Sequence, residues 1–141
     1  MKKLFTYTLP RPFFGYNIPI AIQSSYLRDY ANKKNYLFSL PVTEIVTENT
    51  YFMLKNKFPK KKIEIAFTSV FILPIENSKS LYQIIKCFNK NTKFHFILEN
   101  LIMTGSEFLN WQKQFNKIKK FDNNYENFKN RLKNLKVKKN K

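Results

Sequence analysis

Short hydrophobic segments alternate along the chain with amphipathic segments, an order typical of α/β domains. The hydrophobic segments are rich in β-branched and aromatic residues, which predicts β-strands. These strands are expected over residues 3–8, 36–40, 63–73 and 93–103. The intervening segments carry apolar residues at helical spacing. Helices are therefore expected over residues 19–33, 47–57 and 78–88.

Strands separated by helices of this length are joined by right-handed crossovers, which produce a mostly parallel sheet. We therefore predict a three-layer α/β domain with a four-stranded sheet in the order 2-1-3-4. Thr47 or Asn49 is the expected N-cap of the second helix, and Asn77 or Ser78 that of the third.

From Ser106 onward the pattern changes to one long amphipathic stripe. Apolar residues recur every three or four positions from Phe108 to Leu135, which predicts a long helix. An unbroken helix of this kind would be about 45 Å long, more than a domain of this size covers. Either Asp122–Asn124 breaks it into a hairpin, or its far end packs on a second subunit.

Three parts of the chain follow from these patterns. Residues 1–104 form the α/β domain, and residues 105–135 form the long helix or helical hairpin. Residues 136–141 are expected to be a disordered basic tail.

The composition indicates a folded protein, which we expect in the cytoplasm. Hydrophobic residues make up 43% of the chain, and its 15 Phe and eight Tyr can fill a core. Cys87 is the only cysteine, which excludes an intramolecular disulfide and a four-thiolate zinc site. The sequence contains no secretory signal and no apolar run near the roughly 20 residues of a membrane span.

The formal net charge of +17 permits nucleic-acid binding without establishing it. Of the 26 basic residues only three are arginine, the residue best suited to bidentate phosphate contacts. Abundant Lys, Asn, Ile and Phe are also what AT-rich codon usage produces. The charge itself predicts nonspecific affinity for polyanions at low salt.

Several kinds of chemistry are excluded by residue counts. With two glycines, the chain has neither a Walker loop nor a dinucleotide-binding fingerprint. His95 is the only histidine, which excludes a zinc site with several histidines. We expect no cofactor and no metal.

The loop after the first strand, residues 9–20, is the best candidate for a binding site. It contains three prolines together with Arg11 and Gly15. Rigid loops at the carboxyl end of a first strand are where open α/β sheets bind ligands. The prolines fix φ, and Gly15 can adopt a positive φ. A purely structural connection is the alternative.

Polar side chains at the ends of the predicted strands point to the same edge of the sheet. Arg11, Glu44, Ser69 and Glu99 are expected to converge there in one cleft. Arg11 would hold an anionic group, and one carboxylate would act as general base. The alternative is a set of loop caps and salt bridges.

Three further residues are candidates for the same chemistry. Strand alternation places His95 on one face with Glu99, so the two could share acid–base work, or His95 could be a hydrogen-bonded core residue. Gln23 lies in the first turns of its helix, where free N–H groups favour anions. Arg28 follows on that helix. Both residues are ligand-binding candidates, or ordinary polar helix residues.

A set of motifs across residues 4–103 resembles the sporadic carbohydrate cluster family, which is named for its scattered occurrence in bacterial surface-polysaccharide gene clusters. The motifs are Pro10–Gly15, Ile18–Ile20, Gln23, Arg28–Ala31, Leu40–Pro41, Glu44, Ser69–Pro74 and His95–Glu99. The resemblance implies an accessory role in surface-polysaccharide or lipopolysaccharide biosynthesis. The anionic ligand of the predicted cleft would then be a sugar nucleotide or sugar phosphate.

The order of elements is similar to the catalytic domain of serine recombinases, the resolvases and invertases. In that family the long helix dimerises and contacts DNA, which implies a homodimer and a nucleic-acid partner here. The family's nucleophilic serine has no counterpart in the loop after the first strand, and residues 69–74 carry no arginine where the family has two. The alternative function is therefore a catalytically inactive, resolvase-like nucleic-acid-binding protein.

Overall fold

The computed structural model describes residues 1–13, 15, 17–46 and 50–139. The chain divides into two compact units, Met1–Leu109 and Asn110–Lys141.

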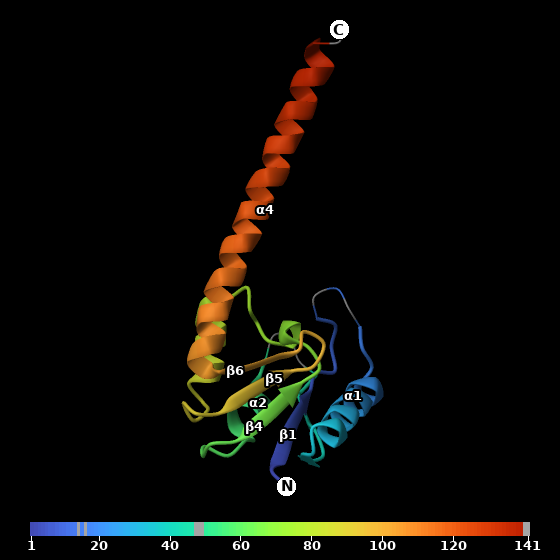
Figure 1. The fold of residues 1–141 in the computed structure, drawn as a ribbon, viewed down its shortest axis with the longest axis vertical. Helices are drawn as coiled ribbons and strands as arrows, with labels where there is room; N and C mark the ends of the chain where they lie inside the picture. Colours follow the sequence, from blue (N-terminus) through green and yellow to red (C-terminus); the bar gives the residue numbers. More distant parts are fainter. Residues whose placement is uncertain (14, 16, 47–49, 140–141) are drawn as a thin grey trace. The chain divides into compact units, whose positions relative to one another are not determined.

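Unit 1 is built on a sheet that has six strands among the described residues (Figure 1). The strands are β1 (Lys3–Thr8), β2 (Leu37–Phe38), β3 (Val42–Thr43), β4 (Glu64–Phe67), β5 (Lys93–Phe96) and β6 (Leu101–Thr104). The order is β2-β1-β4-β5-β6, and β3 also pairs with β1. All pairs are parallel except β5–β6.

The predicted order 2-1-3-4 corresponds to β2-β1-β4-β5, which confirms a mostly parallel sheet. The predicted number of strands is wrong, because the short β3 and the antiparallel β6 are additional.

Different side chains cover the two faces of the sheet. On one face Leu4 and Ala66 pack against Leu27 and Ala31 of α1 (Ile20–Lys33). On the other face aromatic rings pack edge to face or stack, which favours dense burial. The ring centroid of Phe67 lies 5.4 Å from that of Phe96, which in turn lies 5.0 Å from that of Phe108.

Three helical elements lie between β3 and β5 along the chain. They are α2 (Phe52–Asn56), the 3₁₀ helix η1 (Val70–Ile72) and α3 (Ser78–Ile85). Phe58 and Phe88, just after α2 and α3, join the aromatic cluster. The side chain of Asn77 accepts a hydrogen bond from the backbone N–H of Ser80 at 3.1 Å, which confirms Asn77 as the N-cap of α3. The expected caps Thr47 and Asn49 lie outside the described residues.

Three predicted strands are longer than those in the structure, and residues 36–40 contribute only β2. The run 63–73 leaves the sheet after Phe67, because Ser69 caps η1 by accepting a hydrogen bond from Phe71 N at 3.2 Å. The run 93–103 is a hairpin, β5 and β6, whose turn contains Asn100 at φ 54°. Asn adopts this left-handed conformation more readily than most residues, so it permits a reversal that hydrophobicity alone hides.

The last element, α4 (Gly105–Lys139), is one continuous helix whose first residues belong to unit 1. Asp122–Asn124 do not break it, since Asp and Asn cost only about 0.7 kcal/mol each inside a helix. The helix includes residues 136–139 of the expected basic tail, and residues 140 and 141 lie outside the described range. Among the described residues, no helix has the length and hydropathy needed to span a membrane.

Candidate functional site

The loop after β1 is fastened by a buried glutamine. The side-chain amide of Gln23 donates to the carbonyls of Leu9 and Ile18, both at 2.8 Å, and its oxygen accepts from Leu9 N at 3.1 Å. Both amide N–H groups and the amide oxygen of Gln23 therefore bond to the loop backbone. Gly15 is exposed at φ 76°, the positive φ expected of it.

Glu44 is buried, and both of its carboxylate oxygens accept hydrogen bonds from protein donors. One oxygen accepts from the Tyr7 hydroxyl at 2.8 Å and from Leu54 N at 3.3 Å. The other accepts from Ile45 N and Met53 N, both at 3.0 Å. The carboxylate thus holds the start of α2 against β1. Burial and the adjacent carboxylate raise the pKa of Tyr7, which therefore stays a hydrogen-bond donor.

Ser69 and Glu99 form a second polar pair. The Ser69 hydroxyl donates to Glu99 Oε2 at 2.7 Å, and Val70 N donates to Oε1 at 2.6 Å. Glu99 lies in the β5–β6 turn, so this carboxylate ties the turn to the start of η1.

Arg11 lines a cavity of about 380 Å³ at the carboxyl edge of the sheet. Its Nη2 donates to the carbonyl of Thr50 at 3.0 Å, and its guanidinium carbon lies 5.0 Å from the centre of the Tyr51 ring. The same cavity is lined by Glu76 and by apolar residues after β4. Burial raises the pKa of Tyr51, although Arg11 opposes the shift.

The expected convergence of four side chains in one cleft is therefore only partial. Ser69 and Glu99 contact each other, as expected. Neither of them lines the Arg11 cavity, and nor does Glu44. Arg28 lies elsewhere on the surface of α1, with its guanidinium carbon 5.5 Å from the centre of the Phe38 ring.

His95 pairs with Glu64 and not with Glu99. Its Nε2 lies 3.0 Å from Glu64 Oε1, and its Nδ1 lies 2.7 Å from the Tyr30 hydroxyl. The Tyr36 hydroxyl also donates to Glu64, at 2.9 Å. The expected His95–Glu99 pair is wrong because the strand ends at Phe96, which places Glu99 in the following turn.

Glu64 was not among the residues singled out from the sequence. The signal was present in the alternation Glu64-Ile65-Ala66, which places Glu64 on the α1 face with Ala66. The parallel register pairs Ala66 with His95, so the two strands bring the carboxylate and the imidazole to one face.

The pKa values of His95 and Glu64 are both lowered, for different reasons. Burial lowers the pKa of His95, and hydrogen bonding to Glu64 offsets only part of that shift. Burial raises the pKa of Glu64, but the hydrogen bonds from Tyr36 and His95 outweigh it, so the net shift is downward. His95 is therefore neutral and Glu64 ionised near neutral pH.

We expect acid to destabilise unit 1 in two stages. Because the unfolded chain binds a proton at His95 more readily than the folded one, stability falls as pH drops below about 6.5. Glu64 adds a second loss as pH drops below about 4.5. Urea unfolding at several pH values checks this. His95→Gln should flatten the first stage, and an unchanged pH slope in that variant would contradict the assignment.

The described part of α4 beyond Leu109 has two opposite stripes. Trp111, Phe115 and Ile118 lie on one side, with the first two rings stacked at 5.3 Å and Ile118 61% exposed. Lys113, Lys117 and Lys120 are exposed, and at 100° per residue they fall on the opposite side. We call these three residues the basic stripe.

Comparisons with known proteins bear on the fold. No protein-family model matches the chain, and no curated protein sequence matches it. These comparisons lend no support to membership of the sporadic carbohydrate cluster family. One solved structure, the N-terminal catalytic domain of TP901-1 integrase, is 18% identical with a TM-score of 0.57. The match covers 84% of this chain and 97% of that domain. In fold, the chain is thus similar to a serine recombinase catalytic domain.

Proposed function

We propose that this chain is a nucleic-acid-binding protein on a resolvase-like scaffold without recombinase chemistry. The observation that carries the proposal is the basic stripe of Lys113, Lys117 and Lys120. It opens a segment, residues 113–141, with 11 basic and two acidic residues, a net charge of +9. The similarity to an integrase catalytic domain supports the scaffold. The loop of residues 9–20 has no serine, so the family's nucleophile has no counterpart there.

The basic stripe suits contacts with the phosphate backbone of duplex DNA. Successive lysines of the stripe are about one helical turn apart, which places a row of positive charges along α4. Lysines that bind phosphates displace condensed counterions from the DNA. Such contacts do not distinguish one base sequence from another. Because lysine acts as a point charge and lacks the bidentate geometry of arginine, the expected binding is nonspecific.

The apolar stripe of α4 suits a second copy of the chain. Two such helices packed along Trp111, Phe115 and Ile118 would bury these side chains and leave the two basic stripes facing outward. Sedimentation equilibrium of the full chain, alone and with duplex DNA, tests this arrangement.

We expect Lys113→Gln/Lys117→Gln/Lys120→Gln to weaken duplex binding about tenfold or more at about 100 mM salt. Each lost phosphate contact should also reduce the slope of log K against log salt by about 0.9. Fluorescence anisotropy with a labelled duplex measures both effects.

The matched control is Lys79→Gln/Lys86→Gln/Lys90→Gln, which removes three exposed lysines on and after α3. It should leave the affinity nearly unchanged. Equal weakening by the two triple variants would mean that the affinity depends on the overall charge and not on the basic stripe. A wild-type protein without measurable binding at about 150 mM salt would reject the proposal.

A second candidate function follows from the Arg11 cavity. Its volume of about 380 Å³ is within the range of small-molecule sites, and Arg11 supplies a positive charge. An anionic ligand such as a sugar phosphate or sugar nucleotide would fit this chemistry, with Arg11 holding its phosphate.

Thermal unfolding with a panel of sugar nucleotides and sugar phosphates tests this candidate. A ligand present at about 100 times its Kd adds roughly 2.7 kcal/mol to the stability of the native state. The stabilisation should be present in the wild type and absent from Arg11→Ala. A ligand that stabilises both proteins equally would place its site elsewhere.

A further inference from the structure

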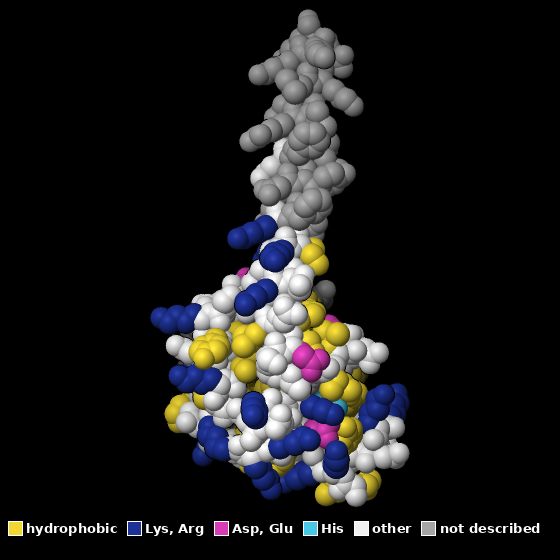
Figure 2. Space-filling view, turned by 60° about the vertical axis from the view of Figure 1, so that its left-hand side comes forward, with side chains coloured by type: hydrophobic (Ala, Val, Ile, Leu, Met, Phe, Trp, Pro, Cys, Tyr) yellow, Lys and Arg dark blue, Asp and Glu magenta, His cyan; other side chains and the backbone are white. Residues whose placement is uncertain are grey.

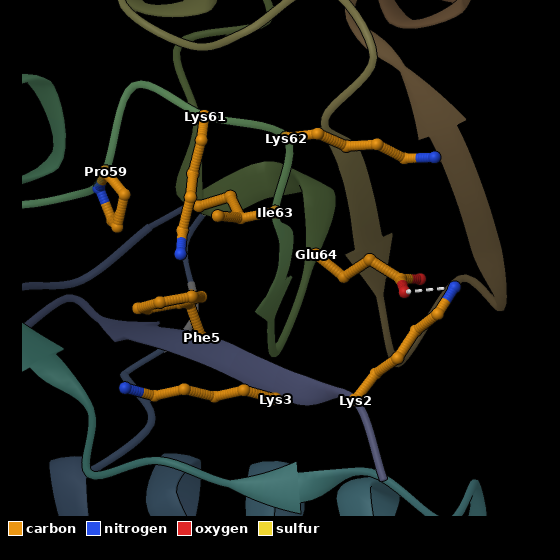
Figure 3. A pocket seen from close by; sticks show the side chains of 8 residues that line it. All are labelled: Lys2, Lys3, Phe5, Pro59, Lys61, Lys62, Ile63 and Glu64. Carbon is orange, nitrogen blue, oxygen red and sulfur yellow. Dashed lines mark ion pairs between the residues drawn. The ribbon is translucent and has the colours of Figure 1, made fainter.

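Four lysines meet at the amino edge of the sheet, the edge opposite the Arg11 cavity. Lys2 precedes β1 and Lys3 begins it, and Lys61 and Lys62 lie just before β4, the parallel neighbour of β1. Together with Phe5 and other residues they line a cavity of about 620 Å³ (Figure 3). We call it the amino-edge pocket. Its volume is within the range of ligand sites in other proteins.

The acidic side chain of the pocket is already engaged. Glu64 Oε2 lies 3.8 Å from Lys2 Nζ, and its Oε1 bonds to His95 and Tyr36. Among the described residues, no ion pair involves Lys3, Lys61 or Lys62. With four lysines and one glutamate, the lining carries a formal charge of +3. The view in Figure 2 likewise shows basic side chains spread over unit 1 with few acidic ones between them.

Phe5 organises two of these lysines. The ammonium nitrogen of Lys3 lies 4.6 Å from the centre of the Phe5 ring, a cation–π contact that limits its freedom. Figure 3 shows Lys61 pointing toward Phe5 from the other side, whereas Lys62 extends away from it. The ammonium groups of Lys3 and Lys61 thus lie on opposite sides of the Phe5 ring.

Lys60, which precedes Lys61, does not point into the pocket. Lys60 Nζ donates to the carbonyls of Cys87 and Lys55, at 2.9 and 3.4 Å, and so serves to join loops. Pro59 and Ile63 add apolar surface to the pocket beside the lysines. A pocket with two directed ammonium groups, apolar walls and a net positive charge matches a ligand with phosphate groups and a flat, less polar part.

We propose that the amino-edge pocket binds a nucleotide, with Lys3 and Lys61 contacting its phosphate oxygens and its base lying against Phe5 and Pro59. The nucleotide is either free or part of a single strand. This site lies entirely within unit 1, and it goes beyond the duplex binding proposed for α4.

Isothermal titration calorimetry of the full chain at about 150 mM salt tests the proposal with ATP, tripolyphosphate and an eight-nucleotide single strand as probes. We expect Lys3→Gln/Lys61→Gln to weaken ATP or strand binding about tenfold or more. The control Lys79→Gln/Lys86→Gln removes the same charge from α3 and its C-cap, and it should change affinity less than about twofold. Tripolyphosphate should bind more weakly than ATP, because it lacks the base.

The outcomes separate the sources of the ligand. Heat with ATP identifies a free nucleotide, and heat with the strand alone identifies a nucleotide within a nucleic acid. No heat with either probe, or equal weakening by both double variants, overturns the proposal. Tripolyphosphate binding as tight as that of ATP overturns the base contact. Circular dichroism checks that the variants fold, and the single variant Lys61→Gln replaces the double one if Lys3→Gln disturbs β1. Failure here leaves the basic-stripe experiment unaffected, since its variants lie on α4.

Discussion

Glu44→Ala is expected to lower the free energy of unfolding by about 3 kcal/mol or more. The substitution removes a buried carboxylate and leaves its four donors without a partner, namely the Tyr7 hydroxyl and the N–H groups of Ile45, Met53 and Leu54. Buried donors without partners are costly because water cannot replace the lost acceptor. Urea unfolding followed by far-UV circular dichroism measures the loss.

Tyr7→Phe provides the matched control for this prediction. It removes one of the four donors and leaves the carboxylate in place, so it should cost only about 1 kcal/mol. The comparison also decides between a structural and a catalytic role. If Glu44 acts as a general base, Glu44→Ala should keep the stability of the wild type while losing an activity. Wild-type stability in Glu44→Ala would therefore contradict our interpretation.

Gln23→Leu should cost about 2–4 kcal/mol, the second large effect. Leucine fills a similar volume but offers no partner to the N–H and carbonyl of Leu9 or to the carbonyl of Ile18. The loop after β1 would then lose its attachment to α1. The same urea experiment measures this loss, and the loop around Arg11 should become more susceptible to proteolysis.

An exposed glutamine serves as the control for Gln23. Gln83 lies on α3 with its side chain in solvent, so Gln83→Leu should change the free energy of unfolding by less than about 0.5 kcal/mol. Equal effects of the two substitutions would mean that leucine itself, and not the lost hydrogen bonds, is responsible.

The parallel part of the sheet could be predicted from the sequence because it depends on local pattern. The strands β1 and β4 are hydrophobic runs separated by helices of crossover length, and this determines both their direction and their order. The hairpin β5–β6 could not be predicted in the same way. Its two strands lie in one predominantly apolar stretch, and the turn between them contains Asn100 in the left-handed conformation.

The candidate site was predicted less well than the fold for a related reason. Residues that follow strands do lie at the carboxyl edge, but their side chains point where the loops direct them. The backbone N–H of Glu44 bonds to the carbonyl of Thr8 at 3.0 Å, which places Glu44 beside Tyr7 and away from the Arg11 cavity. Contacts of this kind join residues 30 or more positions apart, so strand pattern alone does not reveal them.

The placement of Trp111 gives the two units separate spectroscopic signals. It is the only tryptophan of the chain and lies in unit 2, stacked on Phe115. Its emission therefore reports on α4, whereas far-UV circular dichroism reports on both units and near-UV tyrosine bands report mainly on unit 1, which holds the buried Tyr7. Denaturation curves recorded by tryptophan emission and by the near-UV tyrosine bands will show directly whether the helix melts with the sheet or before it.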